Sequence, residues 1–182
     1  TSFKKRTGTN SKVLRGYSLR NSSSICCAVA SLSFGSTSAV KGEGKTFAAV
    51  NLAITMSRDF GKKTLLMDVD CRESTLEKLI RREDQQLMGW AHVVTQKASL
   101  RETLIPYKYE KLFLLPSGKV ECPSSSLITS LGSFDLINEL RKEFDYILMD
   151  APPILPLADM RLLKDLVDGI ILVVKAEETT RE

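Results

Sequence analysis

The hexapeptide KGEGKT, residues 41–46, constrains this chain more than any other feature. Gly42 and Gly44 let the backbone approach a ligand closely, and the helical pattern that opens at Lys45 directs its N–H groups and positive dipole end at the same point. Such a loop suits phosphate groups, with Lys45 reaching the β- and γ-phosphates and the Thr46 hydroxyl placed to ligate magnesium. The predicted nucleotide-binding residues are Gly42, Glu43, Gly44, Lys45, Thr46 and Phe47.

One position departs from the usual phosphate-loop pattern, GxxxxGK[ST]. Its first glycine is replaced here by Ala39. A Gly-Lys-Thr triplet also occurs by chance, so this interpretation needs support from elsewhere in the chain.

Two apolar runs that end in acidic residues supply this support. YILMD places Asp150 at the end of a predicted strand, and LLMDVD places Asp68 and Asp70 after another. Parallel strands deliver such carboxylates to one crevice, where Mg²⁺ needs oxygen ligands. We expect Thr46, Asp68 and Asp150 to bind the metal, and Lys45, Asp68 and Asp70 to serve catalysis. The alternatives are that Asp150 caps a turn and that Asp70 pairs with Arg72.

Strand and helix patterns alternate from Ile25 onward, which predicts an α/β fold: a three-layer, mostly parallel sheet with helices on both faces. Strands are expected within 25–37 and at 63–68, 111–115, 145–150 and 169–174; helices at 46–59, 74–82, about 87–94, 124–143 with a possible break at Gly132, and 157–166. In the first helix, Phe47, Val50 and Ile54 share a face and Gly61 is the stop. The first strand carries several serines, which is unusual for a central strand.

Charge divides the chain unevenly. Residues 1–42 hold seven basic and no acidic side chains, whereas the remainder holds 19 basic and 22 acidic ones, a net of −3. A basic arm of this kind can contact anionic lipid or nucleic acid, but a solvated, disordered tail is the simpler interpretation because Thr, Ser, Gly and Asn fill most of the gaps between the charges. We therefore predict a polar tail at 1–24, one domain at 25–182, and no nucleic-acid partner.

The cysteines favour free thiols over a metal or disulfide framework. Cys26, Cys27, Cys71 and Cys122 show no CxxC spacing, and the chain has a single histidine, His92. Zinc needs more ligands at ligand spacing, and a domain of this size does not depend on disulfides. The longest weakly polar stretch, 25–34, is about half the length of a membrane-spanning helix. These features predict a cytoplasmic domain.

Taken together, the motifs resemble the cytoplasmic ATPase domain of the bacterial tyrosine kinases (BY-kinases) that partner capsular and exopolysaccharide co-polymerases. The family loop TSAxPGEGKT is matched by residues 37–40 and 42–46, its DxDxR motif by Asp68, Asp70 and Arg72, and its acidic strand end with double proline by residues 150–153. Asp159, LPSG at 115–118, PSSSLI at 123–128 and the run DGIILVVKAEETTRE also fit. The likeness extends over residues 36–182.

Several positions depart from that family. Lys41 replaces its usual proline, and Val40 occupies the signature-lysine position of the related partitioning and division-site ATPases, so Lys41 is given no trans-acting role. Of the family's ExxRxxR ring-assembly helix only Arg20 is matched. The family continues with a helix, a strand that contacts adenine and a tyrosine-rich tail. The resemblance thus implies a fold truncated at its C-terminus, without the usual acceptor tyrosines; Tyr107 and Tyr109 are the plausible substitutes.

The resemblance implies an MgATP-binding phosphotransferase, similar to the tyrosine autokinases that regulate capsule and exopolysaccharide synthesis and export. It implies that Asp68 orients or deprotonates the attacking hydroxyl. It also implies a transmembrane co-polymerase or activator as partner, which would hold the domain at the inner face of the plasma membrane, and a homo-oligomer. The alternatives are an ATPase switch of the partitioning type and a nucleotide-binding fragment without turnover. A GTPase is disfavoured because the chain has no NKxD motif.

Overall fold

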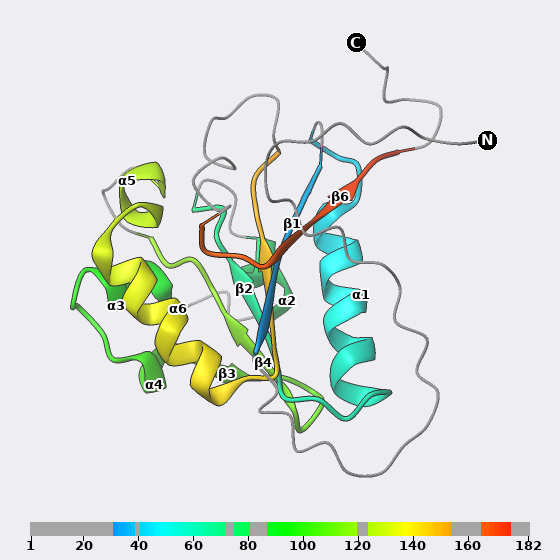
Figure 1. Cartoon of the computed structure of the whole chain (residues 1–182), viewed down its shortest axis with the longest axis horizontal. Helices are drawn as coiled ribbons and strands as arrows, with labels where there is room; N and C mark the ends of the chain where they lie inside the picture. Colours follow the sequence, from blue (N-terminus) through cyan, green and yellow to red (C-terminus); the bar gives the residue numbers. More distant parts are fainter. Residues whose placement is uncertain are drawn as a thin grey trace, which may run out of the picture.

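The computed structural model describes residues 31–38, 41–71, 75–80, 87–119, 124–153 and 165–175. In these ranges one six-stranded sheet has the order β3-β4-β2-β5-β1-β6 (Figure 1). The strands are β1 (Leu32–Ser38), β2 (Thr64–Asp68), β3 (Ile105–Pro106), β4 (Leu112–Leu115), β5 (Tyr146–Asp150) and β6 (Gly169–Val173). The helices are α1 (Lys45–Arg58), α2 (Thr75–Ile80), α3 (Trp90–Val94), α4 (Leu100–Thr103), α5 (Ser124–Ile128) and α6 (Leu131–Glu143).

The sheet is parallel apart from one pairing. β1 pairs with β5 and β6, and β2 pairs with β4 and β5, all in parallel, whereas the short β3 runs antiparallel to β4. The predicted mostly parallel α/β fold is confirmed. One consequence matters for function, because the carboxyl ends of five strands lie along the same edge of the sheet.

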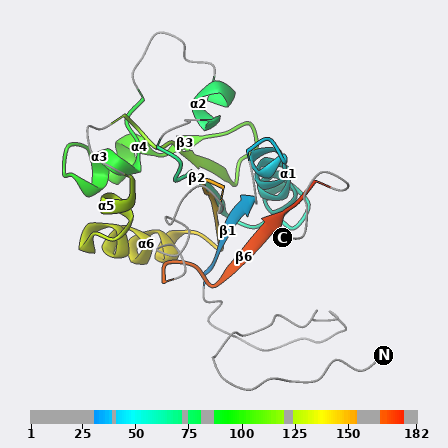
Figure 2. The same ribbon diagram turned by 90° about the horizontal axis from the view of Figure 1, so that it is seen from above.

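Helices cover both faces of the sheet, as Figure 2 shows from above. Alternate residues of each strand point to opposite faces. On β2, Leu66 joins the core cluster that contains Ala49 and Ala53 of α1, whereas Leu65 and Met67 join the cluster that contains residues of α3, α5 and α6. The predicted three layers are therefore present, with a separate hydrophobic core on each side of the sheet.

Helix α1 presents a different face from the one predicted. Its buried residues are Ala49, Ala53 and Ser57, whereas the Phe47 side chain is 76% exposed. Val50 and Ile54 flank the buried stripe and are only partly covered. Small residues let the helix lie close to the sheet, and the larger side chains then fall outside the contact. The predicted stop at Gly61 is confirmed, since this residue has a φ of +62° three residues after the helix ends.

The serine-rich strand β1 lies inside the sheet, between β5 and β6. Serines are unusual in a strand that has neighbours on both sides. Its buried hydroxyls are bonded rather than left in an apolar core. Ser33 Oγ donates to Asp168 Oδ2 at 2.8 Å, and Thr37 Oγ1 donates to the carbonyl of Pro152 at 2.7 Å. A buried hydroxyl that has a hydrogen-bond partner avoids most of the desolvation cost, so polar residues are tolerated here.

The remaining predictions are confirmed in part. The strands expected at 63–68, 111–115, 145–150 and 169–174 agree with β2, β4, β5 and β6 to within one residue at each end. The helix expected over 124–143 is divided, but at Ser130 rather than Gly132, because the Ser130 hydroxyl caps α6 by accepting from Ser133 N at 3.3 Å. Helix α4 and strand β3 were not predicted. The 157–164 part of the last expected helix and the 1–24 tail lie outside the described residues.

A tight junction joins the start of α3 to the turn after β4. Trp90 N donates to Pro116 O at 3.0 Å, and Ala91 N donates to Ser117 O at 3.2 Å. A Cβ atom placed on Gly89 would lie 2.1 Å from the carbonyl oxygen of Pro116, which is backbone and cannot move aside easily. The junction therefore requires glycine at position 89.

We expect Gly89→Ala to lower the free energy of unfolding by about 1–3 kcal/mol, the range for forced overpacking. Gly132→Ala is the matched control, since its Cβ would meet Val94 Cγ1 at 3.3 Å, a side-chain contact that can relax, inside a helix that favours alanine. Urea denaturation of both variants measures the difference. Equal, small changes in the two proteins would contradict the assigned close approach.

Candidate active site

Three parallel strands end together at the upper edge of the sheet in Figure 1. Asp68, the last residue of β2, is in register with Asp150, the last residue of β5, and Ser36 of β1 lies opposite Asp150 on the other side. The loop that follows β1 leads into α1 at this same edge. The topology therefore brings the predicted phosphate loop beside the two predicted strand-end carboxylates.

The loop has the backbone geometry that its glycines suggested. Gly42 and Gly44 have φ values of +93° and +87°, a region that favours glycine, and a Cβ at either position would meet nothing within 4 Å. The glycines are thus needed for conformation rather than for packing. The Glu43 side chain is buried, and its carboxylate accepts a hydrogen bond from Lys175 N at 3.3 Å, next to β6.

Lys45 lies between two acidic side chains. Its Nζ is 3.4 Å from Asp150 Oδ1 and 3.9 Å from Asp70 Oδ2, and the lysine side chain is 12% exposed. Thr46 Oγ1 donates to the second oxygen of Asp150 at 2.5 Å. One strand-end carboxylate therefore contacts both the lysine and the hydroxyl of the predicted loop.

The Asp68 carboxylate is completely buried and held by main-chain donors. Its Oδ1 accepts from Asp70 N at 3.0 Å, and its Oδ2 accepts from Leu76 N at 3.2 Å. Burial raises the pKa of Asp68 to about 7, and the nearby Asp150 and Asp70 act in the same direction against these two hydrogen bonds. Burial also raises the pKa of Asp150, opposed by Lys45 and Thr46.

The charges of this cluster fit a divalent cation. Asp68, Asp70 and Asp150 bring three carboxylates, and Lys45 brings the ammonium that contacts two of them. Within the described ranges no three acidic, histidine or cysteine side chains lie close enough together to hold a metal by themselves. Mg²⁺ is usually bound by one or two protein oxygens together with phosphate and water, rather than by an all-protein cage. The Thr46–Asp150 pair suits that shared mode of binding.

The structure thus brings together Lys45, Thr46, Asp68, Asp70 and Asp150, with Gly42 and Gly44 on the loop beside them. Phe47 is adjacent in sequence, but its side chain extends into solvent, so only its backbone N–H remains a candidate ligand. Arg72, Asp159, Ala39 and Val40 lie outside the described residues.

Sequence reasoning missed two supporting side chains. Ser36 Oγ lies 3.5 Å from the carbonyl of Lys45, and the indole N–H of Trp90 donates to the main-chain carbonyl of Asp68 at 2.8 Å. Ser36 could be identified once the strand order is known, because it pairs with Asp150 in the sheet. Trp90 is the single tryptophan of the chain, but no motif linked it to the site.

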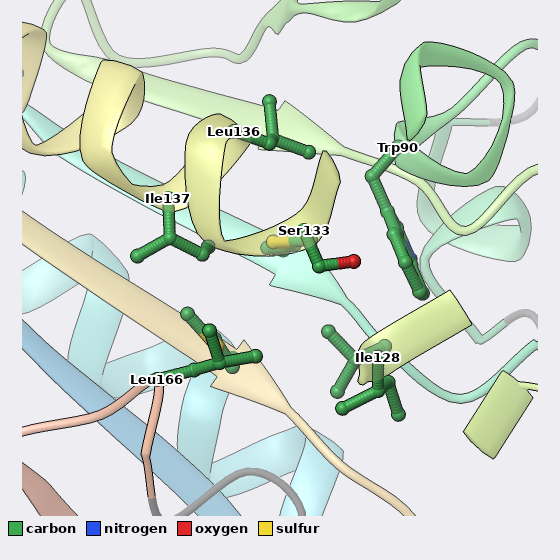
Figure 3. Close-up of a pocket in the computed structure, with 9 residues that line it drawn as sticks. Trp90, Ile128, Ser133, Leu136, Ile137 and Leu166 are labelled. Atoms are coloured by element: carbon green, nitrogen blue, oxygen red, sulfur yellow. The ribbon is translucent and has the colours of Figure 1, made fainter. Parts of the chain in front are cut away.

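A small apolar cavity lies on the α6 side of the sheet and has none of the acidic cluster in its lining (Figure 3). Its lining is apolar apart from Ser133: Met67, Val69, Trp90, Ile128, Ser133, Leu136, Ile137, Met149 and Leu166. The Ser133 hydroxyl is already bonded to Leu127 O at 2.6 Å. This cavity is a packing defect of the core and has no groups that would bind a phosphate.

The pKa of Asp68 predicts how stability depends on pH in metal-free protein. The folded state holds the proton to about pH 7, whereas the unfolded chain releases it near 3.8. The contribution of Asp68 is therefore fully present below pH 3.8 and is lost as the pH rises through 7, a loss of roughly 4 kcal/mol at most.

We expect Asp68→Asn to flatten the fall in melting temperature between pH 5 and 8, measured in EDTA. Glu102→Gln is the control, because hydrogen bonds from Ser99 lower the pKa of that exposed carboxyl from its usual 4.5, so it stays ionised over this range and should leave the slope unchanged. If the melting temperature of Asp68→Asn fell with pH as steeply as that of the wild type, Asp68 would be ionised throughout this range.

No helix within the described ranges is long and apolar enough to cross a membrane.

A family model described as an AAA domain matches residues 37–182. Over 146 residues the chain is 33% identical to the tyrosine-protein kinase YwqD of Bacillus subtilis, covering 80% of this chain and 60% of YwqD. It is 30% identical over 172 residues to the succinoglycan biosynthesis transport protein ExoP of Rhizobium meliloti, covering 93% of this chain and 21% of ExoP.

The solved kinase domain of VpsO is similar in structure, with a TM-score of 0.76 and 28% sequence identity. That likeness covers 83% of this chain and 72% of the VpsO chain. In length, this chain spans about three fifths of its curated kinase relative YwqD. The resemblance drawn from the motifs is confirmed by similarity to bacterial tyrosine-protein kinases in both sequence and fold.

Proposed function

We propose that this chain, which belongs to the AAA domain family, binds ATP with Mg²⁺ and forms the phosphotransferase core of a bacterial tyrosine kinase. The observation that carries the proposal is the contact set at Asp150, which joins Lys45 Nζ at 3.4 Å and Thr46 Oγ1 at 2.5 Å. A lysine, a hydroxyl and a strand-end carboxylate at one helix N-terminus are the groups that a magnesium nucleotide needs.

Each residue then has a defined task. Backbone N–H groups of residues 42–47 surround the phosphates, and Lys45 exchanges its contacts with Asp70 and Asp150 for contacts with phosphate oxygens. Thr46 ligates the metal, with Asp150 and Asp68 holding it directly or through water. Bound Mg²⁺ supplies positive charge that offsets the charge developing on the phosphoryl oxygens.

Asp68 acts on the acceptor side of the reaction in this proposal, and Asp70 acts on the phosphate-binding lysine. Asp68 is fixed by two main-chain hydrogen bonds, so its carboxylate orients an incoming hydroxyl and accepts its proton. Asp70 stays next to Lys45, where it keeps the ammonium in position before nucleotide arrives. Phosphoryl transfer depends mainly on positioning and electrostatics, which a rigid strand end provides.

The kinase interpretation is favoured over an ATPase switch by the curated relative YwqD, a tyrosine-protein kinase 33% identical to this chain. We place the activity in the control of exopolysaccharide production, because ExoP is a succinoglycan biosynthesis transport protein. The proposed partner is a transmembrane co-polymerase that holds the domain at the cytoplasmic face of the membrane. The proposed tyrosine acceptor is presented by a neighbouring copy.

Lys45→Met tests the nucleotide site directly. We expect ATP affinity to fall at least 100-fold, because the variant loses the charge that contacts the phosphates, while the fold is retained. Lys111→Met is the control, a lysine whose Nζ donates to Gly61 O near the C-terminal end of α1. Equilibrium binding of a fluorescent ATP analogue is the measurement. Equal affinities in wild type and a folded Lys45→Met protein would remove the assignment.

Tyr107 and Tyr109 should not become phosphorylated when this chain is incubated with MgATP. Both are partly buried against the α1-side core, and they precede β4, at the amino-terminal edge of the parallel strands, opposite the acidic cluster. In-line transfer needs the hydroxyl roughly 3–3.5 Å from the phosphorus. Phosphopeptide mapping after incubation with labelled ATP is the measurement, with Lys45→Met as the control. Lys45-dependent phosphate on either tyrosine would contradict the prediction.

A further inference from the structure

We infer that Trp90 is a positioning residue for the candidate active site and that its indole N–H fixes the main chain that carries the Asp68 carboxylate. The contacts of Trp90 carry this inference, and only its effect on Mg²⁺ binding rests on the proposed function. Trp90 is 1% exposed, and its Nε1 lies 2.8 Å from the carbonyl oxygen of Asp68.

The strand pairing explains why this carbonyl needs a side-chain donor. In a parallel strand the N–H and C=O of one residue point to the same neighbour, and successive residues alternate between neighbours. Thr64 N donates to Lys111 O, next to β4, whereas Val69 N donates to Asp150 O of β5. By this alternation Thr64, Leu66 and Asp68 all direct their main-chain groups toward β4.

The β2–β4 pairing stops one residue before Asp68. Its last pair is Met67 with Leu115. The residues that follow β4 then bond to the start of α3 instead of to β2. The carbonyls of Pro116 and Ser117 accept from Trp90 N and Ala91 N. The indole thus extends the hydrogen bonding of β2 by one position, at the residue whose side chain enters the acidic cluster.

Trp90 is itself held firmly. Its backbone N–H is bonded to Pro116 O at 3.0 Å, and its ring packs in the α6-side core, where it lines the same cavity as Ile128 and Leu136 (Figure 3). On the other side, Asp68 orients its carboxylate through Asp70 N and Leu76 N. A continuous set of hydrogen bonds therefore runs from the turn after β4 through Trp90 to the carboxylate. Loss of the indole N–H should loosen that carboxylate without touching the phosphate loop.

The experiment removes the N–H and keeps the ring. Because Trp90 is the only tryptophan, growth of a tryptophan auxotroph on benzothienylalanine replaces this one side chain with a sulfur analogue of nearly the same shape. Trp90→Phe is the genetic variant. Leu136→Ala is the packing control, since Leu136 lines the same cavity as Trp90.

Amide hydrogen exchange in nucleotide-free protein is the first readout. We expect the amides of Asp70 and Leu76 to exchange about tenfold faster in the sulfur analogue and in Trp90→Phe, relative to the amide of Leu148, since one hydrogen bond is worth about this factor. Leu136→Ala should leave this ratio unchanged. Unchanged ratios in the analogue, or an equal rise in Leu136→Ala, would overturn the inference.

The Mg²⁺ dependence of ATP binding is the second readout. In Trp90→Phe we expect the Mg²⁺ concentration for half-maximal binding to rise about tenfold, while metal-free ATP affinity changes less than twofold. Wild-type protein that fails to bind MgATP would refute the proposed function, whereas faster exchange at Asp70 and Leu76 would still establish Trp90 as a positioning residue. An unchanged Mg²⁺ curve in a protein whose wild type binds MgATP would refute the positioning of Asp68 by Trp90.

Discussion

The arrangement of this domain depends on two carboxylates held side by side without solvent at the end of adjacent parallel strands. Asp68 and Asp150 are in register and completely buried, a costly placement for charge unless cations and donors surround it. Lys45, Thr46 and the amides of Asp70 and Leu76 provide part of that compensation. Burial nevertheless raises the pKa of both carboxyl groups, and a cation bound at this edge would favour their charged forms.

Much of the polar chemistry elsewhere in the sheet serves the same edge. Strand β1 could have been an ordinary apolar strand, yet Ser36 and Thr37 use their hydroxyls to hold the carbonyls of Lys45 and Pro152, which flank the loop and the acidic strand end. Trp90, in the core on the α6 side, does the same for Asp68. The backbone at each strand end is thus fixed by a side chain, which keeps the carboxylates in place where the regular ladder stops.

The sequence predicted the parts of this site that have local signatures. Gly42, Gly44, Lys45 and Thr46 form a local phosphate-loop pattern, and Asp68 and Asp150, which end apolar runs, support that prediction. The role of Trp90 and the bonding of the β1 serines could not be predicted, because each depends on a neighbour far away in the sequence. The buried face of α1 was predicted incorrectly for a related reason. Hydrophobic periodicity favours Phe47, but close packing on the sheet selects Ala49 and Ala53, and Phe47 remains exposed.

The phosphate loop is also connected to the far end of the sheet through β6. Among the described strands β6 is at the edge, and Ile170 and Leu172 are about half exposed, so apolar burial alone attaches it weakly. Polar contacts hold both of its ends. Asp168 receives hydrogen bonds from Ser33 and Arg141 before the strand begins, and Glu43 of the loop accepts from Lys175 after it ends. The Glu43 side chain therefore links the loop that precedes Lys45 to the residues that follow β6. Ser33, near the start of β1, thus holds the amino-terminal end of β6, and the β1–β6 pairing leads from there to Lys175 beside Glu43.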